Sequence, residues 1–311
     1  MGMGPILPFL SWVWFRLKWI EFKYRNAGLE SKLIDLGDGA TTMHCWVPKE
    51  GSCKMGTEKM KRPAILFLQG FGMSGMVGWE LQAPYFAKNF NVYVPDLLFF
   101  GESFTTETGR SELFQGDCVK KMLDILNVNK VHIVGTSYGG IIGYYMAHKY
   151  PKLVDKLVVA SAGVTMDPTS NERLAELAKV SSVKELLVPK DVNMFRRGMD
   201  IASIWRSWMI PNFVLQDMFD WFNTQNSVQR KELIDGMITG KKGAPPVPTV
   251  PQDVLILWGT KDQIFLPDLA DQLKRHLGDK ANLIYVKGCG HVPQIEKPKE
   301  YNSHLLKFLS T

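Results

Sequence analysis

The sequence is poor in cysteine, which argues against two ways of stabilising a fold. Its 311 residues include four cysteines, Cys45, Cys53, Cys118 and Cys289, and no two of them form a CxxC pair. Neither a disulfide scaffold nor a structural zinc site is expected from this spacing. The chain also lacks an Asn-x-Ser/Thr sequon. Both absences suit a reducing compartment, so we expect a cytoplasmic protein.

Internal repeats, low-complexity tracts and blocks of like charge are also lacking. The formal net charge is +6, and the basic residues are spread along the chain. Neither a zinc-finger spacing nor a basic-aromatic RNA motif occurs, so we expect no nucleic-acid partner. With 45% hydrophobic and 22% charged residues, the composition is that of a globular protein. The length allows one large domain, or one core with a substantial insertion.

Residues 1–28 form an unusual aromatic and basic N-terminal segment. Between Phe9 and Ile20 it is rich in Trp and Phe and is interrupted by Arg16 and Lys18. It is too short and too charged to span a bilayer. One interpretation is an interfacial helix that makes a peripheral membrane contact, because such side chains suit the headgroup layer. The other is a helix packed on the protein's own lid or core, and the imperfect helical wheel leaves both open.

From Ala64 onward, short apolar runs alternate with longer helical patterns, which is typical of βαβ units on a parallel sheet. Strands are predicted at 64–68, 92–94, 131–134, 157–160, 254–258 and 283–286, with helices at 111–126, 140–149, 266–277 and 300–309. Segments 29–36 and 42–47 are expected to form an antiparallel pair in front. The predicted core therefore comprises residues 29–162 and 251–311.

Residues 163–250 interrupt this alternation with a span that is too long for a simple connection but strongly helical in pattern. The spacing i, i+3, i+4, i+7 is followed by Ile201, Ile204, Trp205 and Trp208, and again by Leu215, Met218, Phe219 and Phe222. Residues 182–185 fit a capping box. We interpret the span as a helical lid over the carboxyl edge of the sheet. Trp205, Trp208 and Phe219 are its candidate substrate-binding residues, with internal packing as the alternative.

The strand at 131–134 runs directly into Gly135-Thr136-Ser137-Tyr138-Gly139-Gly140 and then an apolar helix. This is a G-x-S-x-G nucleophile elbow in its strand–turn–helix context. The serine must occupy a strained turn, and the flanking glycines remove side chains that would clash there. Ser137 is therefore the candidate nucleophile.

A serine hydroxyl needs a base, and the base needs an acid. His291 lies in a Gly-rich loop directly after the last predicted strand, whereas the other five histidines lie in or beside strands and helices. Asp262 follows the penultimate strand at the same edge of the sheet, and the order Ser, Asp, His is the one expected for this motif. Asp167, after the strand at 157–160, is the rival acid.

Two backbone N–H groups must meet the oxyanion of a tetrahedral intermediate. One candidate is the amide of Tyr138, directly after the nucleophile. The other is the amide of Phe71, in the Gln69-Gly70-Phe71-Gly72 turn after the first buried strand. A phosphate-binding loop is excluded because no GKS or GKT follows. This chemistry requires no metal and no organic cofactor.

Together these segments resemble the α/β-hydrolase superfamily over nearly the whole chain after residue 29. Residues 93–103, Tyr-Val-Pro-Asp-Leu-Leu-Phe-Phe-Gly-Glu-Ser, resemble its P-D-x-x-G-x-G-x-S segment, with Phe99 in place of the first glycine. Residues 290–298 resemble the histidine loop of monoacylglycerol-lipase-like hydrolases and of meta-cleavage-product hydrolases. The first of these segments is most similar to plant members, which implies a plant origin. Where the family usually has His-Gly, this chain has Gln69-Gly70, so the hydrogen bond of that histidine to neighbouring loops is expected to be lost.

The resemblance implies an eight-stranded, mostly parallel sheet flanked by helices, with the lid inserted. It implies a serine hydrolase that cleaves a carboxylic ester of a moderately hydrophobic small molecule, or a monoacylglycerol, through an acyl-enzyme on Ser137. Carbon–carbon bond hydrolysis of a dienone and acyl transfer to an alcohol use the same triad and remain alternatives. A ligand receptor with little turnover is the alternative from another class. Ser137 argues against the related enzymes that use Asp as nucleophile.

Overall fold

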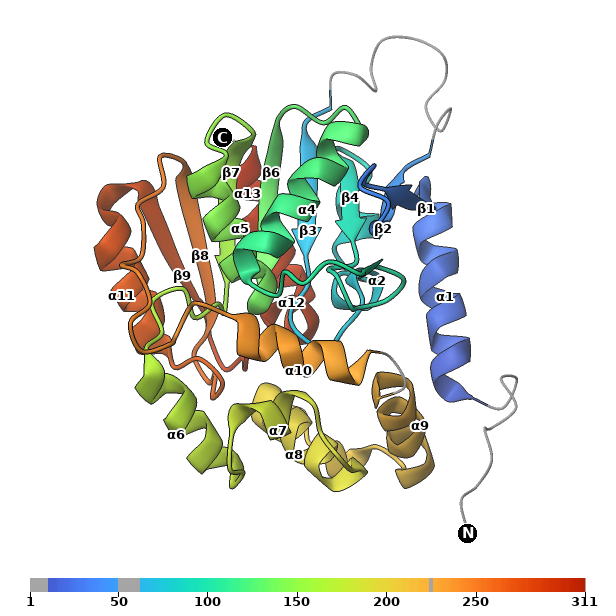
Figure 1. Ribbon diagram of the computed structural model, residues 1–311, viewed down its shortest axis with the longest axis vertical. Helices are drawn as coiled ribbons and strands as arrows, with labels where there is room; N and C mark the ends of the chain where they lie inside the picture. The colour runs from blue at the N-terminus through green and yellow to red at the C-terminus, as the bar shows by residue number, and fades with distance from the viewer. Residues whose placement is uncertain (1–10, 50–61, 224–225, 311) are drawn as a thin grey trace.

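A computed structural model describes residues 11–49, 62–223 and 226–310; Cys53 and residues 1–10 of the N-terminal segment lie outside these ranges. One sheet runs in the order β1-β2-β4-β3-β6-β7-β8-β9, with β5 beside β2 (Figure 1). The strands are β1 (Leu29–Asp35), β2 (Thr41–Pro48), β3 (Ala64–Leu68), β4 (Asn91–Pro95), β5 (Phe104–Thr105), β6 (Val131–Thr136), β7 (Val154–Ala160), β8 (Asp253–Gly259) and β9 (Ala281–Val286). All pairs from β4 to β9 along the path are parallel, and β2 pairs antiparallel with its neighbours.

The expected mostly parallel sheet is confirmed, and its strand count differs from the expected eight by one. The eight strands of the hydrogen-bonded path are those predicted from the apolar runs and the antiparallel pair. The ninth, β5, has two residues that pair with Thr41 and Thr42. A strand of that length leaves no periodic pattern in a sequence.

Two hydrophobic layers cover the sheet, because its central strands are buried on both faces. One layer packs α4 (Glu112–Ile125), α5 (Tyr138–Lys149) and α11 (Pro267–Leu277) on the sheet. The other packs α1 (Trp12–Asn26), α2 (Gly75–Gly78), α3 (Ala83–Phe86) and α13 (Pro298–Leu309) on the opposite face. The helix α12 (Pro293–Glu296) follows the loop after β9. The helix α1 therefore packs on the core, which is one of the two arrangements that the sequence left open.

The span between β7 and β8 is a helical insertion. It contains α6 (Pro168–Ala178), α7 (Val183–Leu187), α8 (Val192–Ala202), a 3₁₀ turn η3 (Ser207–Met209), α9 (Asn212–Asn223) and α10 (Ser227–Gly236). Figure 1 shows these helices gathered at the end of the sheet toward which β3 and β4 point. The residues that follow the parallel strands therefore face the insertion.

Two local predictions within the insertion are wrong. The side chain of Ser182 makes no capping hydrogen bond, and Ser181 donates to Glu185 instead. The apolar spacing at 201–208 does not form one helix, since α8 ends at Ala202. Ser207 donates from its amide and its hydroxyl to the Asp200 carboxylate. Such local side-chain bonds compete with the helical ladder and end it.

The helix α1 packs one face on the protein and exposes the other. Val13, Ile20 and Tyr24 are buried. Arg16 and Lys23, which disturb the helical wheel, point inward and pair with Glu80 at 2.5 and 3.5 Å. The outer face exposes aromatic rings, among them Trp12, Trp14, Phe15, Trp19 and Phe22. Within the described residues, no helix is both long and apolar enough to cross a membrane.

Candidate active site

Ser137 occupies the strained turn that the elbow motif predicts. It lies between β6 and α5 with φ 52° and ψ −122°, a region that non-glycine residues rarely adopt. A Cβ on Gly139 would lie 2.3 Å from the carbonyl oxygen of Leu68, and one on Gly135 would lie 2.4 Å from that of Gly139. Close approach of β3, β6 and α5 therefore requires glycine at both positions.

His291 and Asp262 meet at the carboxyl edge of the sheet, although 28 residues separate them in the sequence. His291 Nδ1 and Asp262 Oδ2 are 2.9 Å apart, and both side chains are buried. The other carboxylate oxygen of Asp262 accepts the amides of Ile264 and Phe265 at 2.9 and 3.1 Å. These amides fix the carboxylate, so it orients the imidazole with Nε2 left for another partner.

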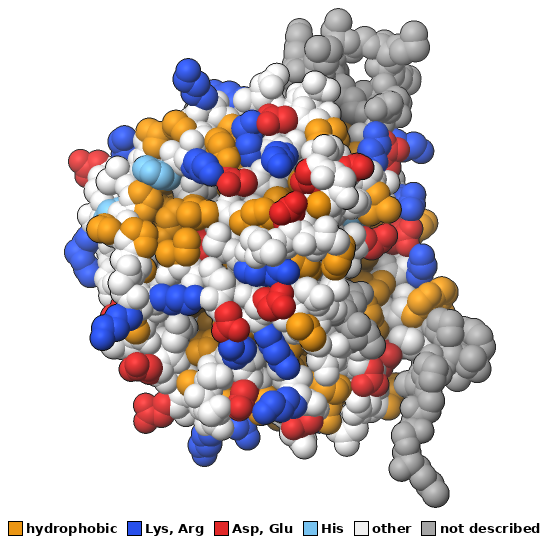
Figure 2. Space-filling view, in the orientation of Figure 1, with side chains coloured by type: hydrophobic (Ala, Val, Ile, Leu, Met, Phe, Trp, Pro, Cys, Tyr) orange, Lys and Arg blue, Asp and Glu red, His pale blue; other side chains and the backbone are white. Residues whose placement is uncertain are grey.

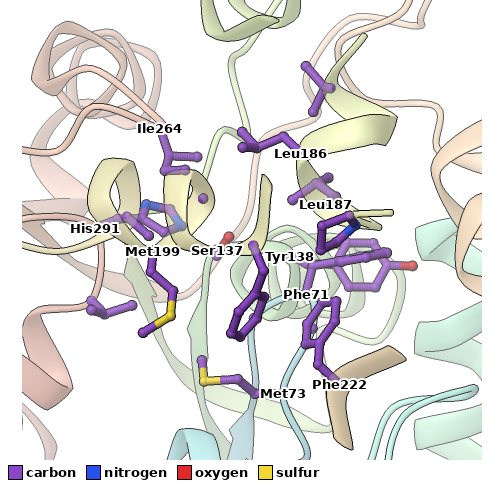
Figure 3. Close-up of a pocket in the computed structure, with 18 of the residues that line it drawn as sticks. Phe71, Met73, Ser137, Tyr138, Leu186, Leu187, Met199, Phe222, Ile264 and His291 are labelled. Atoms are coloured by element: carbon purple, nitrogen blue, oxygen red, sulfur yellow. The ribbon is translucent and has the colours of Figure 1, made fainter. Parts of the chain in front are cut away.

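Ser137 and His291 line one cavity of about 770 Å³. Figure 3 shows the imidazole of His291 beside Ser137, with Ile264 and Met199 on its side of the serine. Among the described residues, no hydrogen bond joins the two side chains. Hydrogen bonds of this kind are often long in unliganded sites and shorten when substrate binds.

The turn after β3 approaches the serine closely. A Cβ on Gly70 would lie 3.3 Å from Ser137 Cβ. In the described part of the chain, the amides of Phe71 and Tyr138 donate to no other group. The side chains of these two residues also touch, with ring centroids 5.8 Å apart. These two amides, next to Ser137 and in the turn that approaches it, are therefore candidate donors to an oxyanion.

Gln69 corrects the expectation that the neighbouring loop loses its anchor. With its amide oriented to satisfy both ends, Gln69 accepts the Leu97 N–H at 2.8 Å and donates to the Pro95 carbonyl at 3.1 Å. The side chain is fully buried. It therefore ties the loop after β4 to the turn that carries Phe71.

The rival residues are occupied elsewhere. Asp167 caps α6, where it accepts the Ser170 amide and the Thr169 hydroxyl. His44 Nδ1 lies 2.8 Å from Asp96 Oδ2 in the core. Burial alone would lower the pKa of His44, but the hydrogen bond and charge of Asp96 outweigh it and raise that pKa. Burial lowers the pKa of His132. The surroundings of His44 and His132 therefore favour structural roles over a catalytic one.

The three candidate substrate residues do not line the cavity. Trp205 and Trp208 are 56% and 76% exposed, while Phe219 is buried and packs on Phe195. Residues that the sequence did not single out form the walls instead, including Met199 and Leu186 from the insertion and Leu17 from α1. Phe222 also lines it and lies beside Phe71 in Figure 3. Of the two apolar sets with helical spacing, only the one in α9 identified residues that line the cavity, namely Met218 and Phe222.

No group of three or more His, Cys, Asp or Glu side chains that could hold a metal occurs among residues 11–49, 62–223 and 226–310. Ser137 and His291 are among the polar side chains that line the cavity. Asp262 does not line it and contacts His291.

A family model described as alpha/beta hydrolase fold matches residues 63–196. An uncharacterized protein of Mycobacterium tuberculosis is 28% identical over 80% of this chain and 76% of its own. The monoacylglycerol lipase ABHD6 of Bos taurus is 27% identical over the same shares. A 2-hydroxy-6-oxononadienedioate/2-hydroxy-6-oxononatrienedioate hydrolase of Pseudomonas sp. is 24% identical over 90% of this chain and 96% of its own.

Among solved structures, a bacterial membrane phospholipase A has a TM-score of 0.77 at 20% identity, with 95% of this chain and 90% of that chain covered. The protein therefore has the α/β-hydrolase fold. Its relatives include a lipase and a carbon–carbon bond hydrolase, which support a hydrolase and leave the bond that it cleaves open. None of the relatives named here is a plant protein, so the plant origin stays a prediction.

Proposed function

We propose that the protein is a serine hydrolase that cleaves a carboxylic ester of a moderately hydrophobic molecule, such as a monoacylglycerol, through an acyl-enzyme on Ser137. The observation that carries the proposal is the buried 2.9 Å bond between His291 Nδ1 and Asp262 in the cavity that Ser137 lines. This bond leaves Nε2 as the atom that can take a proton from the serine.

In the proposed reaction, His291 Nε2 takes the proton of Ser137, whose Oγ attacks the ester carbonyl carbon. The amides of Phe71 and Tyr138 donate to the oxyanion, and the N-terminus of α5 adds a favourable dipole. Asp262 stabilises the imidazolium that forms. His291 then protonates the leaving alcohol, and a water activated by the same nitrogen releases the acid and restores Ser137.

The cavity supports a largely apolar substrate. Its walls are built mainly from Leu, Ile, Val, Met and Phe side chains, and its volume is about 770 Å³, in the range of sites for drug-sized ligands. The similarity to a monoacylglycerol lipase agrees with such a substrate.

Hydrolysis of a carbon–carbon bond is the second candidate, and the Pseudomonas relative favours it. The dioate in that relative's name carries two carboxylates, which need cationic partners when buried. Among the residues that the structure describes, three Arg or Lys side chains line this cavity: Arg16 is paired with Glu80, Lys184 with Asp235, and Lys241 donates to the Asp235 backbone carbonyl. That pairing favours a neutral ester, and parallel ester and dienone panels separate the two reactions. Acyl transfer would be detected by a second product when an alcohol is added.

The test is hydrolysis of p-nitrophenyl esters of increasing chain length by the wild type and by Ser137→Ala. Loss of a triad nucleophile lowers kcat by about 10⁶-fold, so we expect the variant to be inactive. Ser161→Ala is the matched control, because Ser161 is a buried serine after β7 that does not line the cavity. Activity that persists in Ser137→Ala would exclude an acyl-enzyme on this residue.

A peripheral membrane contact through α1 belongs to the same proposal. The exposed Trp and Phe rings of this helix, interspersed with Lys18 and Arg25, suit the interface between headgroups and acyl chains. A cytoplasmic enzyme with this contact would have direct access to lipid esters.

A further inference from the structure

The inner face of α1 lines the same cavity as Ser137. Val13, Leu17 and Ile20 repeat along that face and contribute to the cavity wall. With a rise of 1.5 Å per residue, the contact from Val13 to Ile20 extends for about 10 Å. Met73 and Val77, from the segment after the Phe71 turn and from α2, line the cavity as well. We call the part of the cavity between these two walls the α1 arm.

The two charged side chains that line the α1 arm, Arg16 and Glu80, form an ion pair at 2.5 Å. Lys23, which does not line the cavity, lies 3.5 Å from the same carboxylate. The rest of the arm is aliphatic or aromatic. An uncharged hydrocarbon chain can lie there without removing water from an unpaired charge.

The opposite part of the cavity has a different chemistry. Where the insertion approaches the surface, Asn171, Ser181, Ser182 and Lys184 line it together with Lys241. Figure 3 shows Phe71, Met73 and Phe222 to one side of Ser137 and His291, Met199 and Ile264 to the other. We expect an ester with one apolar and one polar end to place its apolar end in the α1 arm.

The wall that α1 provides is held at several points. Asp217 of α9 accepts the Val13 amide at 2.8 Å and the Ser11 hydroxyl at 2.9 Å. At the other end of the helix, the Tyr24 hydroxyl donates to the Met76 carbonyl at 3.2 Å. A wall fixed in this way sets a definite width for the arm.

We propose that α1 forms the binding site for the hydrocarbon chain of the substrate, with Leu17 at its centre, and so determines chain-length preference. The proposal rests on the ester hydrolysis proposed above. In this orientation the acyl chain runs from the carbonyl at Ser137 past Phe71 and Met73 to Leu17. The alcohol leaves toward the polar part of the cavity.

The experiment compares Leu17→Trp with Ile125→Trp. The first variant places a large ring in the α1 arm, and the second places the same ring on the exposed side of α4, away from the cavity. Each methylene that loses burial weakens binding about fourfold. We therefore expect Leu17→Trp to lower kcat/KM for p-nitrophenyl dodecanoate by at least about tenfold and to leave the acetate within about twofold. Ile125→Trp should leave both esters unchanged.

Two further measurements keep the result decisive. Val77→Trp fills the same arm from the opposite wall, so it answers the question if Leu17→Trp does not fold. Calorimetric titration of dodecanoate into the Ser137→Ala protein, with and without Leu17→Trp, measures chain binding without catalysis. Weaker dodecanoate binding in the Leu17→Trp protein, with no ester hydrolysed by any variant, would retain the chain site and exclude the esterase. Hydrolysis could instead need Ser137 while Leu17→Trp and Val77→Trp both keep the chain-length profile of the wild type. That result would exclude the chain site and retain the esterase.

Discussion

The position of Ser137 depends on a glycine at residue 139. A Cβ on Gly139 would lie 2.3 Å from the Leu68 carbonyl oxygen and 2.5 Å from that of Gln69, at the end of β3 that leads to the Phe71 turn. Gly139→Ala should therefore push this turn away from Ser137. We expect about 1–3 kcal/mol of lost stability from overpacking and a kcat about 10²-fold lower, because the oxyanion donor moves. Thermal denaturation and ester kinetics measure the two effects.

Gly198→Ala is the control for the stability effect only, because Gly198 also lines the cavity. Gly198 is inside α8, and its added Cβ would meet Leu186 Cδ1 at 3.5 Å, an ordinary contact. Replacing a helical glycine by alanine usually stabilises by about 0.5–1 kcal/mol. If Gly139→Ala were as stable as Gly198→Ala and as active as the wild type, the close packing of β3 on α5 could not be what positions Ser137.

The three candidate catalytic residues could be predicted because each follows its own strand and carries a local motif. The pairing of His291 with Asp262 agrees with that prediction, and their catalytic roles remain to be tested. Phe99 is a position whose environment the local motif did not predict. It is fully buried at φ 71°, where the family pattern has glycine. The guanidinium of Arg110, 4.6 Å from its ring centroid, packs on it, and this contact has no signature in the sequence.

At the scale of elements, the histidine loop is tied to the helical insertion. Glu296 of α12 accepts the amide of Gly290 at 2.7 Å with one oxygen and the amide of Ile204, after α8, at 3.1 Å with the other. The His291 amide itself donates to the Ala202 carbonyl at 2.9 Å. Because movement of the insertion would break these bonds, the position of His291 depends on it.

Glu296→Ala removes the acceptor shared by the loop and the insertion. We expect a loss of about 1–3 kcal/mol from two unpaired amides and a fall in kcat of up to about 10²-fold from misplacement of His291. Glu300→Ala is the control, since this carboxylate on α13 is half exposed and pairs only loosely with Lys297 at 3.7 Å. Equal kcat in the two variants would mean that His291 is held without the insertion.

Elements of the core followed the sequence pattern closely, whereas in the insertion α9 followed it and residues 201–208 did not. The buried strands and α4, α5, α11 and α13 lie within a few residues of their predicted ranges, because their periodicity reflects packing on one sheet. In the insertion, Trp205 and Trp208 keep a helical spacing although Ser203 to Arg206 are not helical. Their rings face solvent, so the spacing there did not report a buried face.

For the whole molecule, α1 packs on the core, which is one of the two alternatives expected from the sequence, and the membrane contact stays a proposal. The inner face of the helix packs on the core and lines the cavity, while its outer face exposes Trp19 and Phe22 at 58% and 52%, with ring centroids 5.7 Å apart. Figure 2 shows hydrophobic and charged side chains side by side at the edge where Figure 1 places α1. Apolar side chains therefore occur on both faces of α1, and Lys18, Glu21 and Arg25 lie among those of the outer face.

We expect the protein to bind lipid vesicles through the outer face of α1, and mainly by apolar contact. Lys18 and Arg25 are each paired with Glu21 at 2.8 Å, so little free positive charge is left on this face to attract anionic lipid. Co-sedimentation with zwitterionic vesicles should therefore persist at high salt, where charge attraction is screened.

A Trp19→Ala/Phe22→Ala protein should bind at least about tenfold more weakly, since two large aromatic surfaces no longer enter the interface. Ile125→Ala removes an exposed apolar side chain from α4, on the other face of the sheet, and should bind like the wild type. Binding that the double variant retains, or that salt abolishes, would place the lipid contact elsewhere or make it electrostatic. The double variant should also keep the wild-type chain-length profile, because neither ring lines the cavity.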